Sequence, residues 1–351
     1  MASWLRFEHR QGGHAVKICV VGAGAIGGLV AVKLARAGEQ VSVVARGGHL
    51  AAIRERGLTL VEDGRTDVVR LTATDRIAEL GPQDLVVLAM KAHQVAPVAA
   101  EVAALCGPET ILLTAQNGIP WWYFMKHGGP YEGTRLESVD PGGVIAAHLE
   151  VERVVGSIIY PAAEIAAPGV IHHVEGNRIT IGELDGRDTP RVAALAETLR
   201  RAGFKARVTG DLRSEIWVKL WGNCTFNPIS ALTHATLAGM LRFPVARALA
   251  TETMREAQAV GEKLGARFGV TLEKRIAGAE GVGEHKTSML QDVESGRPLE
   301  IDALLGAVLE LGRLTGTPTP HLSAVYACVA LLARTLQDEG GRLRVEKIGG
   351  R

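Results

Sequence analysis

Hydrophobic and polar positions follow two alternating patterns in the first half of the chain. Short runs rich in β-branched residues predict buried strands, and between them apolar residues recur every three or four positions, which predicts helices. Strands are predicted over 15–21, 41–45, 85–89, 110–114, 154–160, 178–181 and 206–208, and helices over 26–37, 95–105 and 191–201. Strands that alternate with helices predict a parallel sheet with helices on both faces.

The second half of the chain has a different pattern. From Leu212 onward the strand signal disappears, and apolar spacing predicts helices over 212–227, 244–268, 284–294, 301–314 and 321–337. Pro228 is expected to end the first of these helices, because the residue before a proline avoids helical geometry. The change near Gly210 predicts four segments: an extension over 1–14, an α/β domain over 15–210, an all-α domain over 211–340 and a tail over 341–351.

Composition narrows the class of protein. The 351 residues carry 39 basic and 38 acidic side chains, a formal net charge of +1. Nucleic-acid-binding domains usually gather a basic excess on one face, so this balance argues against nucleic acid as a partner. No apolar run is long enough to predict a membrane span, and Met1–His14 lacks the apolar core of a signal peptide.

Cysteine and histidine usage indicates a reducing compartment and no metal site. The four cysteines lie far apart in apolar runs, which predicts buried reduced thiols and a cytoplasmic location; they are Cys19, Cys106, Cys224 and Cys328. No histidine pair with helical spacing has a carboxylate partner, so no metal ligand set is predicted.

A GxGxxG pattern follows the first predicted strand. It consists of Gly22, Ala23, Gly24, Ala25, Ile26 and Gly27. It lies between a buried strand and an amphipathic helix, and this context makes the pattern indicative of dinucleotide binding. The first glycine permits a tight turn, the second lets the backbone approach a pyrophosphate, and the third lets helix and strand pack closely. A glycine-rich turn without a ligand is the alternative.

The end of the second predicted strand indicates which dinucleotide binds. NAD-binding domains place an acidic residue there to hold the ribose 2′-hydroxyl. This chain has Arg46 instead, and no acid. A guanidinium can pair with a 2′-phosphate through two hydrogen bonds, so NADP(H) is the predicted cofactor. An ordinary surface arginine is the alternative.

Two later strands end in polar residues where cofactors bind in such sheets. Lys91 follows one of them, and Gln116-Asn117-Gly118 follows the other. Lys91 and Asn117 are candidate contacts to a ribose, a carboxamide or a substrate carboxylate. Turn chemistry explains them equally well, since Asn-Gly is a common turn pair.

The all-α half contains a candidate acid–base site. Lys219, Asn223 and Asn227 repeat at four-residue spacing and form a polar stripe beside a tryptophan-rich apolar face. A partly buried lysine there would have a lowered pKa and could protonate a developing alkoxide. A solvated helix lysine is the alternative. Ser288 could cap a helix or donate to a substrate carboxylate, and Glu300 could act in the site or only favour a helix N-terminus.

These motifs together resemble the ketopantoate reductase (2-dehydropantoate 2-reductase) family over about residues 16–336. The motifs are GAGAIGG at 22–28, Arg46, MKAHQV at 90–95, QNG at 116–118, WVKLWGNCTFNPISAL at 217–232, TSMLQD at 287–292 and EID at 300–302. The resemblance implies an α/β fold with an N-terminal Rossmann-type, doubly wound sheet and an all-α C-terminal domain, and an active site in the cleft between the two.

The resemblance also implies roles for individual residues. It implies that a hydride passes from NADPH to the 2-keto carbon of ketopantoate, in pantothenate biosynthesis. Lys219 is similar to the family's proton donor, and Glu300 to a glutamate near cofactor and substrate. Asn223, Asn227 and Ser288 resemble its substrate contacts, and Arg46, Lys91 and Asn117 resemble its cofactor contacts.

Two features depart from the family's pattern and leave the substrate open. The aromatic, Gly- and Pro-rich segment over 121–143 is longer than in compact members, and the stretch after Ser230 lacks an asparagine that some members place there. Another branched or bulky 2-keto acid is therefore an alternative substrate, and a protein that senses NADP(H) without turnover is an alternative class. The long C-terminal helices are compatible with a homodimer.

Overall fold

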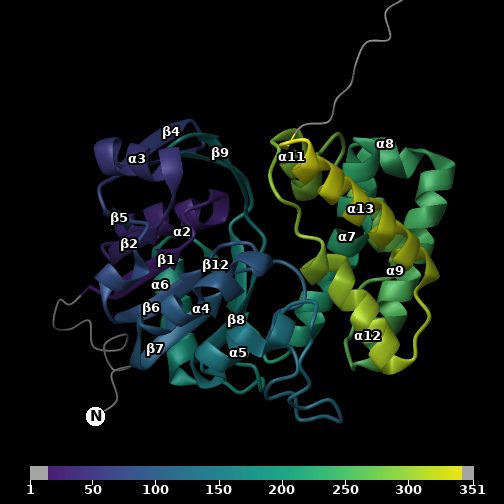
Figure 1. The fold of residues 1–351 in the computed structure, drawn as a ribbon, viewed down its shortest axis with the longest axis horizontal. Helices are drawn as coiled ribbons and strands as arrows, with labels where there is room; N and C mark the ends of the chain where they lie inside the picture. Colours follow the sequence, from purple (N-terminus) through teal and green to yellow (C-terminus); the bar gives the residue numbers. More distant parts are fainter. Residues whose placement is uncertain (1–14, 342–351) are drawn as a thin grey trace, which may run out of the picture. The chain divides into compact units, whose positions relative to one another are not determined.

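The computed structural model describes residues 15–341 (Figure 1). The predicted extension over 1–14, and the predicted tail beyond residue 341, lie outside the described residues. The chain divides into two compact units after Leu212: unit 1 is Met1–Leu212 and unit 2 is Arg213–Arg351.

Unit 1 is built on an eight-stranded sheet in the order β12-β11-β8-β7-β6-β1-β2-β5. The strands are β1 (Lys17–Val21), β2 (Gln40–Val44), β5 (Thr72–Thr74), β6 (Gln83–Leu88), β7 (Cys106–Thr114), β8 (Val154–Ile159), β11 (Arg178–Gly182) and β12 (Lys205–Val208). All neighbours are parallel except β8 and β11, which are antiparallel. The sheet is parallel as predicted, apart from this one junction.

The strand order reverses between β1 and β6. From β1 the chain moves outward to β2, whereas β6, β7 and β8 follow one another in the opposite direction. In open α/β sheets such a reversal leaves a crevice at the carboxyl ends of the strands, and ligands bind there. The sheet is of the doubly wound, Rossmann type.

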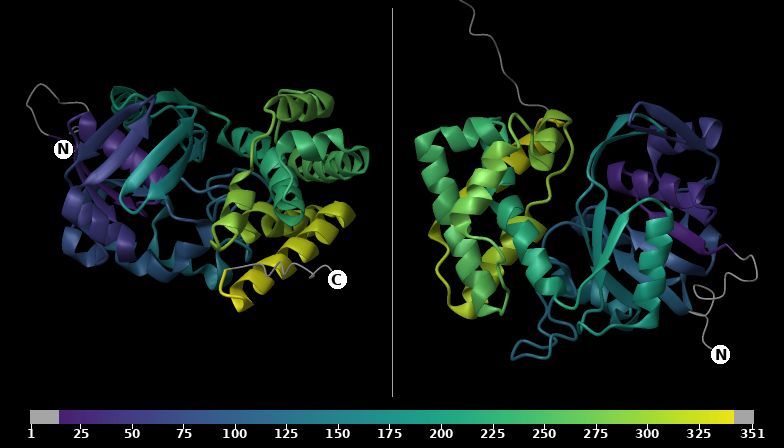
Figure 2. Two further views of the ribbon diagram at one scale, coloured as in Figure 1. Left: turned by 90° about the horizontal axis from the view of Figure 1, so that it is seen from above. Right: turned by 180° about the vertical axis from the view of Figure 1, so that it is seen from behind.

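Helix α2 (Ala25–Arg36) lies between the large sheet and a smaller one, as Figure 2 shows for the purple and teal strands. The smaller sheet has the order β4-β3-β10-β9, with β3 (Leu58–Glu62), β4 (Arg65–Val69), β9 (Ala162–Ala167) and β10 (Val170–Glu175). A Cβ on Gly28 would lie 2.6 Å from the side chain of Ile171. The glycine therefore permits close packing of α2 on the smaller sheet.

The smaller sheet was not predicted, although its first hairpin has a recognisable turn. Asp63 and Gly64 join β3 to β4, and both have positive φ angles, of 49° and 73°. Asp-Gly is typical of two-residue hairpin turns with two positive φ angles. Three of the five positions in β4 are exposed and none is buried, so the alternation of apolar residues is too weak to mark the strand.

The predicted helix over 95–105 is broken. Its region contains η3 (Ala92–Gln94), η4 (Ala96–Val98) and the short α4 (Ala99–Ala103). Pro97 occupies the start of η4. Because proline lacks an N–H group and restricts the preceding residue, it starts a new turn instead of continuing the old one. The remaining helices of unit 1 are α3 (Gly47–Arg56), α5 (Val144–His148) and α6 (Pro190–Arg201), with η2 (Ile77–Leu80), η5 (Pro141–Gly143) and η6 (Val151–Arg153).

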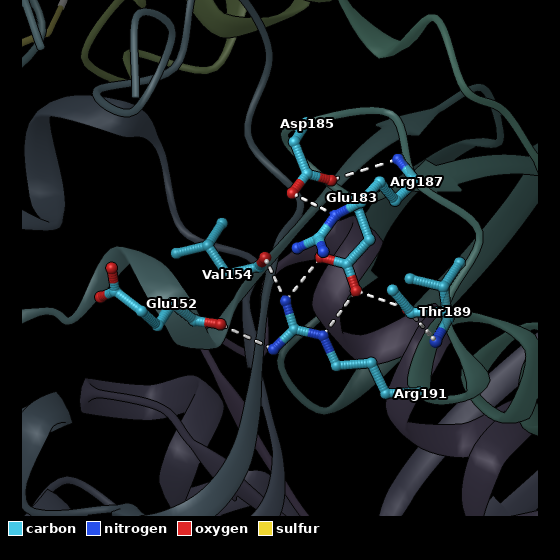
Figure 3. A network of polar contacts seen from close by, with 8 residues as sticks. Glu152, Val154, Glu183, Asp185, Arg187, Thr189 and Arg191 are labelled. Carbon is cyan, nitrogen blue, oxygen red and sulfur yellow. Dashed lines mark hydrogen bonds and ion pairs between the residues drawn. The ribbon is translucent and has the colours of Figure 1, made fainter. Parts of the chain in front are cut away.

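A buried ion pair fastens α6 to the sheet (Figure 3). Arg191 donates from Nε and Nη2 to the two carboxylate oxygens of Glu183, at 2.6 and 2.5 Å. Its Nη1 and Nη2 also donate to the backbone carbonyls of Glu152 and Val154. The hydroxyl of Thr189, the N-cap of α6, also donates to Glu183. Because both carboxylate oxygens of Glu183 accept charge-assisted hydrogen bonds from Arg191, this cluster holds the β11 end in place.

Unit 2 is helical among the described residues. It contains α7 (Leu212–Thr233), α8 (Leu237–Arg242), α9 (Pro244–Lys263), α10 (Leu272–Gly281), α11 (Ser288–Glu294), the π-helical η7 (Asp302–Gly306), α12 (Ala307–Thr315) and α13 (Pro320–Asp338). Helix α9 packs against α8, α10, α12 and α13. Helix α7 carries three of the largest buried aromatic side chains of the unit, Trp217, Trp221 and Phe226.

Pro228 does not end α7, contrary to the prediction. The helix continues to Thr233 with Pro228 inside it. An interior proline costs about 3 kcal/mol because it loses one backbone hydrogen bond and crowds the preceding turn. Ile229 and Ala231, in the turn after it, are buried, and burial of apolar side chains offsets that cost.

Three other helix boundaries differ from the prediction. Helix α9 ends at Lys263, before Gly265, whose φ of +84° suits a helix end. Helix α11 begins only at Ser288 because Thr287 is its N-cap. Helices α8 and α10 were not predicted; both are short, with partly exposed faces.

The four cysteines are free, but not all are buried as predicted. Cys19 and Cys224 are buried, and burial raises the pKa of each thiol to about 12. Cys106 is half-buried and Cys328 is exposed on α13. A search of the described residues finds no helix long and apolar enough to cross a membrane, and no cluster of three or more candidate metal ligands.

Candidate functional site

Four adjacent parallel strands of unit 1 carry the predicted cofactor residues at their carboxyl ends. The strands lie in the order β7-β6-β1-β2. Asn117 follows β7, Lys91 follows β6, the segment 22–27 follows β1, and Arg46 follows β2. Residues up to 95 positions apart in sequence, Gly22 and Asn117, therefore line one edge of the sheet, on both sides of the point where the strand order reverses.

The glycines of the turn after β1 are required by close contacts. Gly22 has a φ of +100°, and a Cβ on it would lie 2.9 Å from the backbone nitrogen of Met90. A Cβ on Gly27 would lie 1.9 Å from the carbonyl oxygen of Gly22. The N–H groups of Gly22 and Ala23 both donate to the carbonyl of Val44, at 3.1 and 2.9 Å. The turn is therefore fixed between β2 and β6.

Gly24 differs from these two because the space beside it is open. A Cβ there would meet nothing within 4 Å. Gly24 is the N-cap of α2, which has no side-chain cap and no acidic residue in its first turn. The first N–H groups of a helix have no partner within the helix, and they attract anions. The turn therefore fits a pyrophosphate.

Arg46 is exposed and forms the N-cap of α3, just beyond β2. The next two residues are Gly47 and Gly48, and a Cβ on either would meet nothing within 4 Å. Helix α3 also has no acidic residue in its first turn. A guanidinium beside an open, uncapped helix start fits a phosphate group better than a ribose hydroxyl.

His49, which sequence reasoning missed, links this region to the smaller sheet. Its Nδ1 accepts a hydrogen bond of 3.0 Å from the N–H of Gly169, in the turn between β9 and β10. Burial lowers the pKa of His49, and an interaction with the backbone of Ala23 opposes this shift. A neutral ring is required for Nδ1 to accept. His49 thus helps position α3 and the turn after β1; its only sequence signal is its place three residues after Arg46.

Lys91 and Asn117 are half-buried at the next two strand ends. The backbone N–H of Lys91 donates to the side chain of Gln94 at 3.2 Å. Gln116 donates to the carbonyl of Leu88, which ties the end of β7 to the end of β6. Gly118 has a φ of +87°. Turn chemistry is thus present at both places, and Gln116 and Gly118 contribute to it after β7.

Lys219 and Glu300 interact electrostatically within unit 2. Burial lowers the pKa of Lys219 to about 8, and the negative charge of Glu300 raises it and so limits the shift. Desolvation disfavours the ammonium form, whereas a nearby carboxylate favours it. A lysine with a pKa near neutrality can act as a general acid. Lys219 is half-buried on α7, whereas the alternative interpretation requires a fully solvated helix lysine. The acid in the first turn of η7 is Asp302, and Glu300 directly precedes the N-cap residue Ile301.

The polar stripe on α7 meets the start of α11. Asn227 is only 6% exposed, and its Nδ2 donates to the hydroxyl of Ser288 at 3.4 Å. Ser288 itself is exposed. The N-cap of α11 is Thr287, whose hydroxyl accepts from the N–H of Leu290, so the predicted cap role of Ser288 is wrong. Asn223, one turn before Asn227, is half-buried.

The chain matches family profiles over both units. The profile described as ketopantoate reductase PanE/ApbA matches residues 18–186, and the profile described as its C-terminal domain matches residues 211–333. A 2-dehydropantoate 2-reductase of Mesorhizobium japonicum is 56% identical over 319 residues, which are 91% of this chain and 98% of that protein. The chain belongs to the ketopantoate reductase family.

Other members of the family agree in sequence and in fold. A 2-dehydropantoate 2-reductase of Pyrococcus horikoshii is 30% identical over 90% of this chain and 96% of that protein. The crystal structure of a candidate ketopantoate reductase from Ralstonia solanacearum MolK2 is 42% identical, with a TM-score of 0.89, over 92% of this chain and 99% of the other. Both groups of candidate site residues lie inside the two ketopantoate reductase matches.

Proposed function

We propose that this protein reduces the 2-keto group of ketopantoate to a hydroxyl group with NADPH, as its relatives' names describe for them. The observation that carries the proposal is the pair formed by Lys219 and Glu300, because it provides a proton donor tuned close to neutral pH. A protein that only binds a dinucleotide does not need such a group.

The cofactor residues belong to unit 1. The backbone of Gly22, Ala23, Gly24, Ala25, Ile26 and Gly27 would hold the pyrophosphate, and Arg46 the 2′-phosphate. Lys91 and Asn117, at the ends of β6 and β7, would contact the nicotinamide half. The absence of an acidic residue from the first turns of α2 and α3 favours a negatively charged phosphate group at each. NADPH supplies a hydride to the keto carbon when it is bound.

The acid–base residues belong to unit 2. Lys219 donates a proton from Nζ to the ketone oxygen as negative charge develops on it, and the product leaves as an alcohol. Glu300 keeps Lys219 protonated over a wider pH range, because its charge opposes the effect of burial. The reaction therefore requires both units.

The substrate residues are Asn223, Asn227 and Ser288. The hydroxyl of Ser288 accepts from Asn227, so its own hydrogen can be donated to the substrate carboxylate. Asn227 thereby orients Ser288. Asn223 lies one helical turn from Lys219, where its amide can donate to a substrate oxygen.

A substrate panel tests the proposal. NADPH consumption is measured with ketopantoate, 2-ketoisovalerate and pyruvate, each also with NADH. Strong preference for ketopantoate with NADPH is expected. Reduction of another keto acid, but not of ketopantoate, would support the proposed mechanism and show that the proposed substrate is wrong. Tight NADPH binding with no reduction of any keto acid would favour a sensor and contradict the proposal.

The cellular location and the oligomeric state complete the proposal. Four free thiols suit a reducing compartment, and we propose a cytoplasmic location. A Staphylococcus aureus ketopantoate reductase of the same fold is described as dimeric. We propose a homodimer for this chain also, and light scattering on the purified protein tests it.

A further inference from the structure

The aromatic segment after β7 contains a buried donor that has no acceptor. Trp121 is 6% exposed, and its indole nitrogen is buried without a hydrogen-bond partner among the described residues. An indole N–H can only donate. Burial of such a group without an acceptor is unfavourable, and instances in folded proteins need an explanation such as a ligand.

The indole nitrogen of the neighbouring Trp122, in contrast, has a hydrogen-bond partner. The indole nitrogen of Trp122 donates to the hydroxyl of Thr114, the last residue of β7, at 3.0 Å. The ring of Trp122 also packs against β8, where a Cβ on Gly156 would lie 2.7 Å from it. Trp122 therefore fastens the segment to the sheet, whereas Trp121, one residue earlier, has a donor that this packing does not use.

The position of Trp121 is fixed. Ile119 is fully buried, Pro120 restricts the backbone, and the N–H of Tyr123 donates to the carbonyl of Pro120 at 3.0 Å. Side chains held in this way bind a ligand with little loss of conformational entropy. The unpaired donor is therefore preorganised and does not belong to a mobile loop.

The place of Trp121 in the fold indicates which ligand it meets. Trp122 bonds to the end of β7, so Trp121 lies at the carboxyl edge of that strand. The phosphate-binding turn follows β1, and Arg46 follows β2, on the side away from β7. A dinucleotide held at those two strands directs its nicotinamide towards β6 and β7. The reacting carbon of the substrate must come within about 3–3.5 Å of it.

We propose that Trp121 is a substrate-binding residue, whose indole N–H donates to an oxygen of the bound 2-keto acid. A 2-keto acid has a carboxylate and a ketone, and both groups only accept. The flat ring would also form an apolar wall beside the acid's side chain, so Trp121 would influence which keto acid fits. This inference rests on the proposed function, which supplies the class of ligand.

The test compares Trp121→Phe with the matched control Trp122→Phe. Each change keeps an aromatic ring and removes one N–H. We expect Trp121→Phe to raise KM for the keto acid by about fivefold to fifteenfold, the effect of one lost hydrogen bond, with Kd for NADPH unchanged. Both changes remove buried ring volume and so lower the Tm of the ligand-free protein, but the fall should be smaller for Trp121→Phe, because no hydrogen bond is lost there. Trp122→Phe should lower Tm by about 2–4 °C more than Trp121→Phe does, because the bond to Thr114 is lost as well.

A second measurement separates this inference from the proposed function. Binding of the keto acid to the protein with NADP⁺, where no reduction can occur, is followed as a rise in Tm. If wild type shows the rise and Trp121→Phe loses most of it, the inference stands even if the wild type shows no turnover. An equal rise in both proteins, a change in Kd for NADPH instead, or a Tm of ligand-free Trp121→Phe as low as that of Trp122→Phe would each overturn it.

Discussion

Asn227 donates a hydrogen bond of 3.4 Å to Ser288, although the two residues are 61 positions apart in the chain. One lies on α7, whose polar stripe includes Lys219, and the other begins α11. The bond joins two groups that sequence reasoning could only place separately. It also leaves the hydroxyl hydrogen of Ser288 available for a substrate carboxylate.

Replacement of Ser288 by alanine should weaken substrate binding alone. We expect KM for the keto acid to rise about tenfold, since hydrogen bonds to charged groups contribute roughly 1.5–3 kcal/mol, with little change in Kd for NADPH. Steady-state kinetics and a cofactor titration measure both. Ser323→Ala on α13, where the hydroxyl bonds to the carbonyl of Thr319, is the matched control. Equal KM values for wild type and Ser288→Ala would show that Ser288 does not bind the substrate.

Replacement of Lys219 by alanine should reduce kcat by about 10²-fold or more, the range expected for a general acid. Because burial places the pKa of Lys219 at about 8, the rate of reduction should be constant below that pH. Above it the rate should fall about tenfold per pH unit, as the proton donor is lost. Lys263→Ala, an exposed lysine at the end of α9, serves as the control. A rate that rises through this range would contradict the role of Lys219 as an acid.

Replacement of Glu300 by glutamine should shift that pH profile. The carboxylate of Glu300 raises the pKa of Lys219, so its neutralisation should lower that pKa further. The decline in rate should then begin at a lower pH than in the wild type. Glu252→Gln, an exposed residue of α9, should leave the profile unchanged. A profile that does not move in Glu300→Gln would show that Glu300 acts in some other way.

Two glycine variants should separate cofactor binding from folding. Gly24→Ala should leave Tm unchanged, since its Cβ meets nothing within 4 Å, but should raise Kd for NADPH because the methyl group occupies the path of the pyrophosphate. Gly27→Ala should lower Tm, because its Cβ would collide with the carbonyl of Gly22. Thermal melts and cofactor titrations of both variants measure this. An unchanged Kd for NADPH in Gly24→Ala would mean that the pyrophosphate does not bind beside Gly24.

Arg46 should determine the preference for NADPH over NADH. We expect Arg46→Ala to raise Kd for NADPH by about 10- to 100-fold, because a charge-assisted pair with the 2′-phosphate is lost. Kd for NADH should change little. Arg56→Ala, at the opposite end of α3, is the control. An equal loss of affinity for both cofactors would mean that Arg46 supports the helix and does not select the phosphate.

The sequence predicted what depends on local pattern. Buried strands such as β1 and β6 and the turn at Gly22 have strong periodic or glycine signals, and the family resemblance named the candidate site residues. Pro228 was misjudged because burial of the following turn outweighs a local penalty. The smaller sheet was missed because its strands have half-exposed, charged faces, and its pairing of β3 with β10 joins segments far apart in the chain.

The site was predictable as a set of residues, but not as a set of interactions. No sequence pattern indicates that Asn227 bonds to Ser288, that Glu300 affects the pKa of Lys219, or that His49 reaches Gly169. Nor does it separate Trp121 from Trp122, which are adjacent and identical in type. Their difference arises only when Trp122 meets Thr114, and such pairings depend on how distant segments pack.

Transfer of deuterium is the most direct test of the central claim. Ketopantoate is incubated with the protein and NADPH that carries deuterium at the transferable position of the nicotinamide, and the product is analysed by mass spectrometry and NMR. The account predicts pantoate with one deuterium on the carbon of the former ketone, formed by wild type and far more slowly by Lys219→Ala. Formation of no labelled hydroxy acid by a wild-type protein that binds NADPH would contradict it.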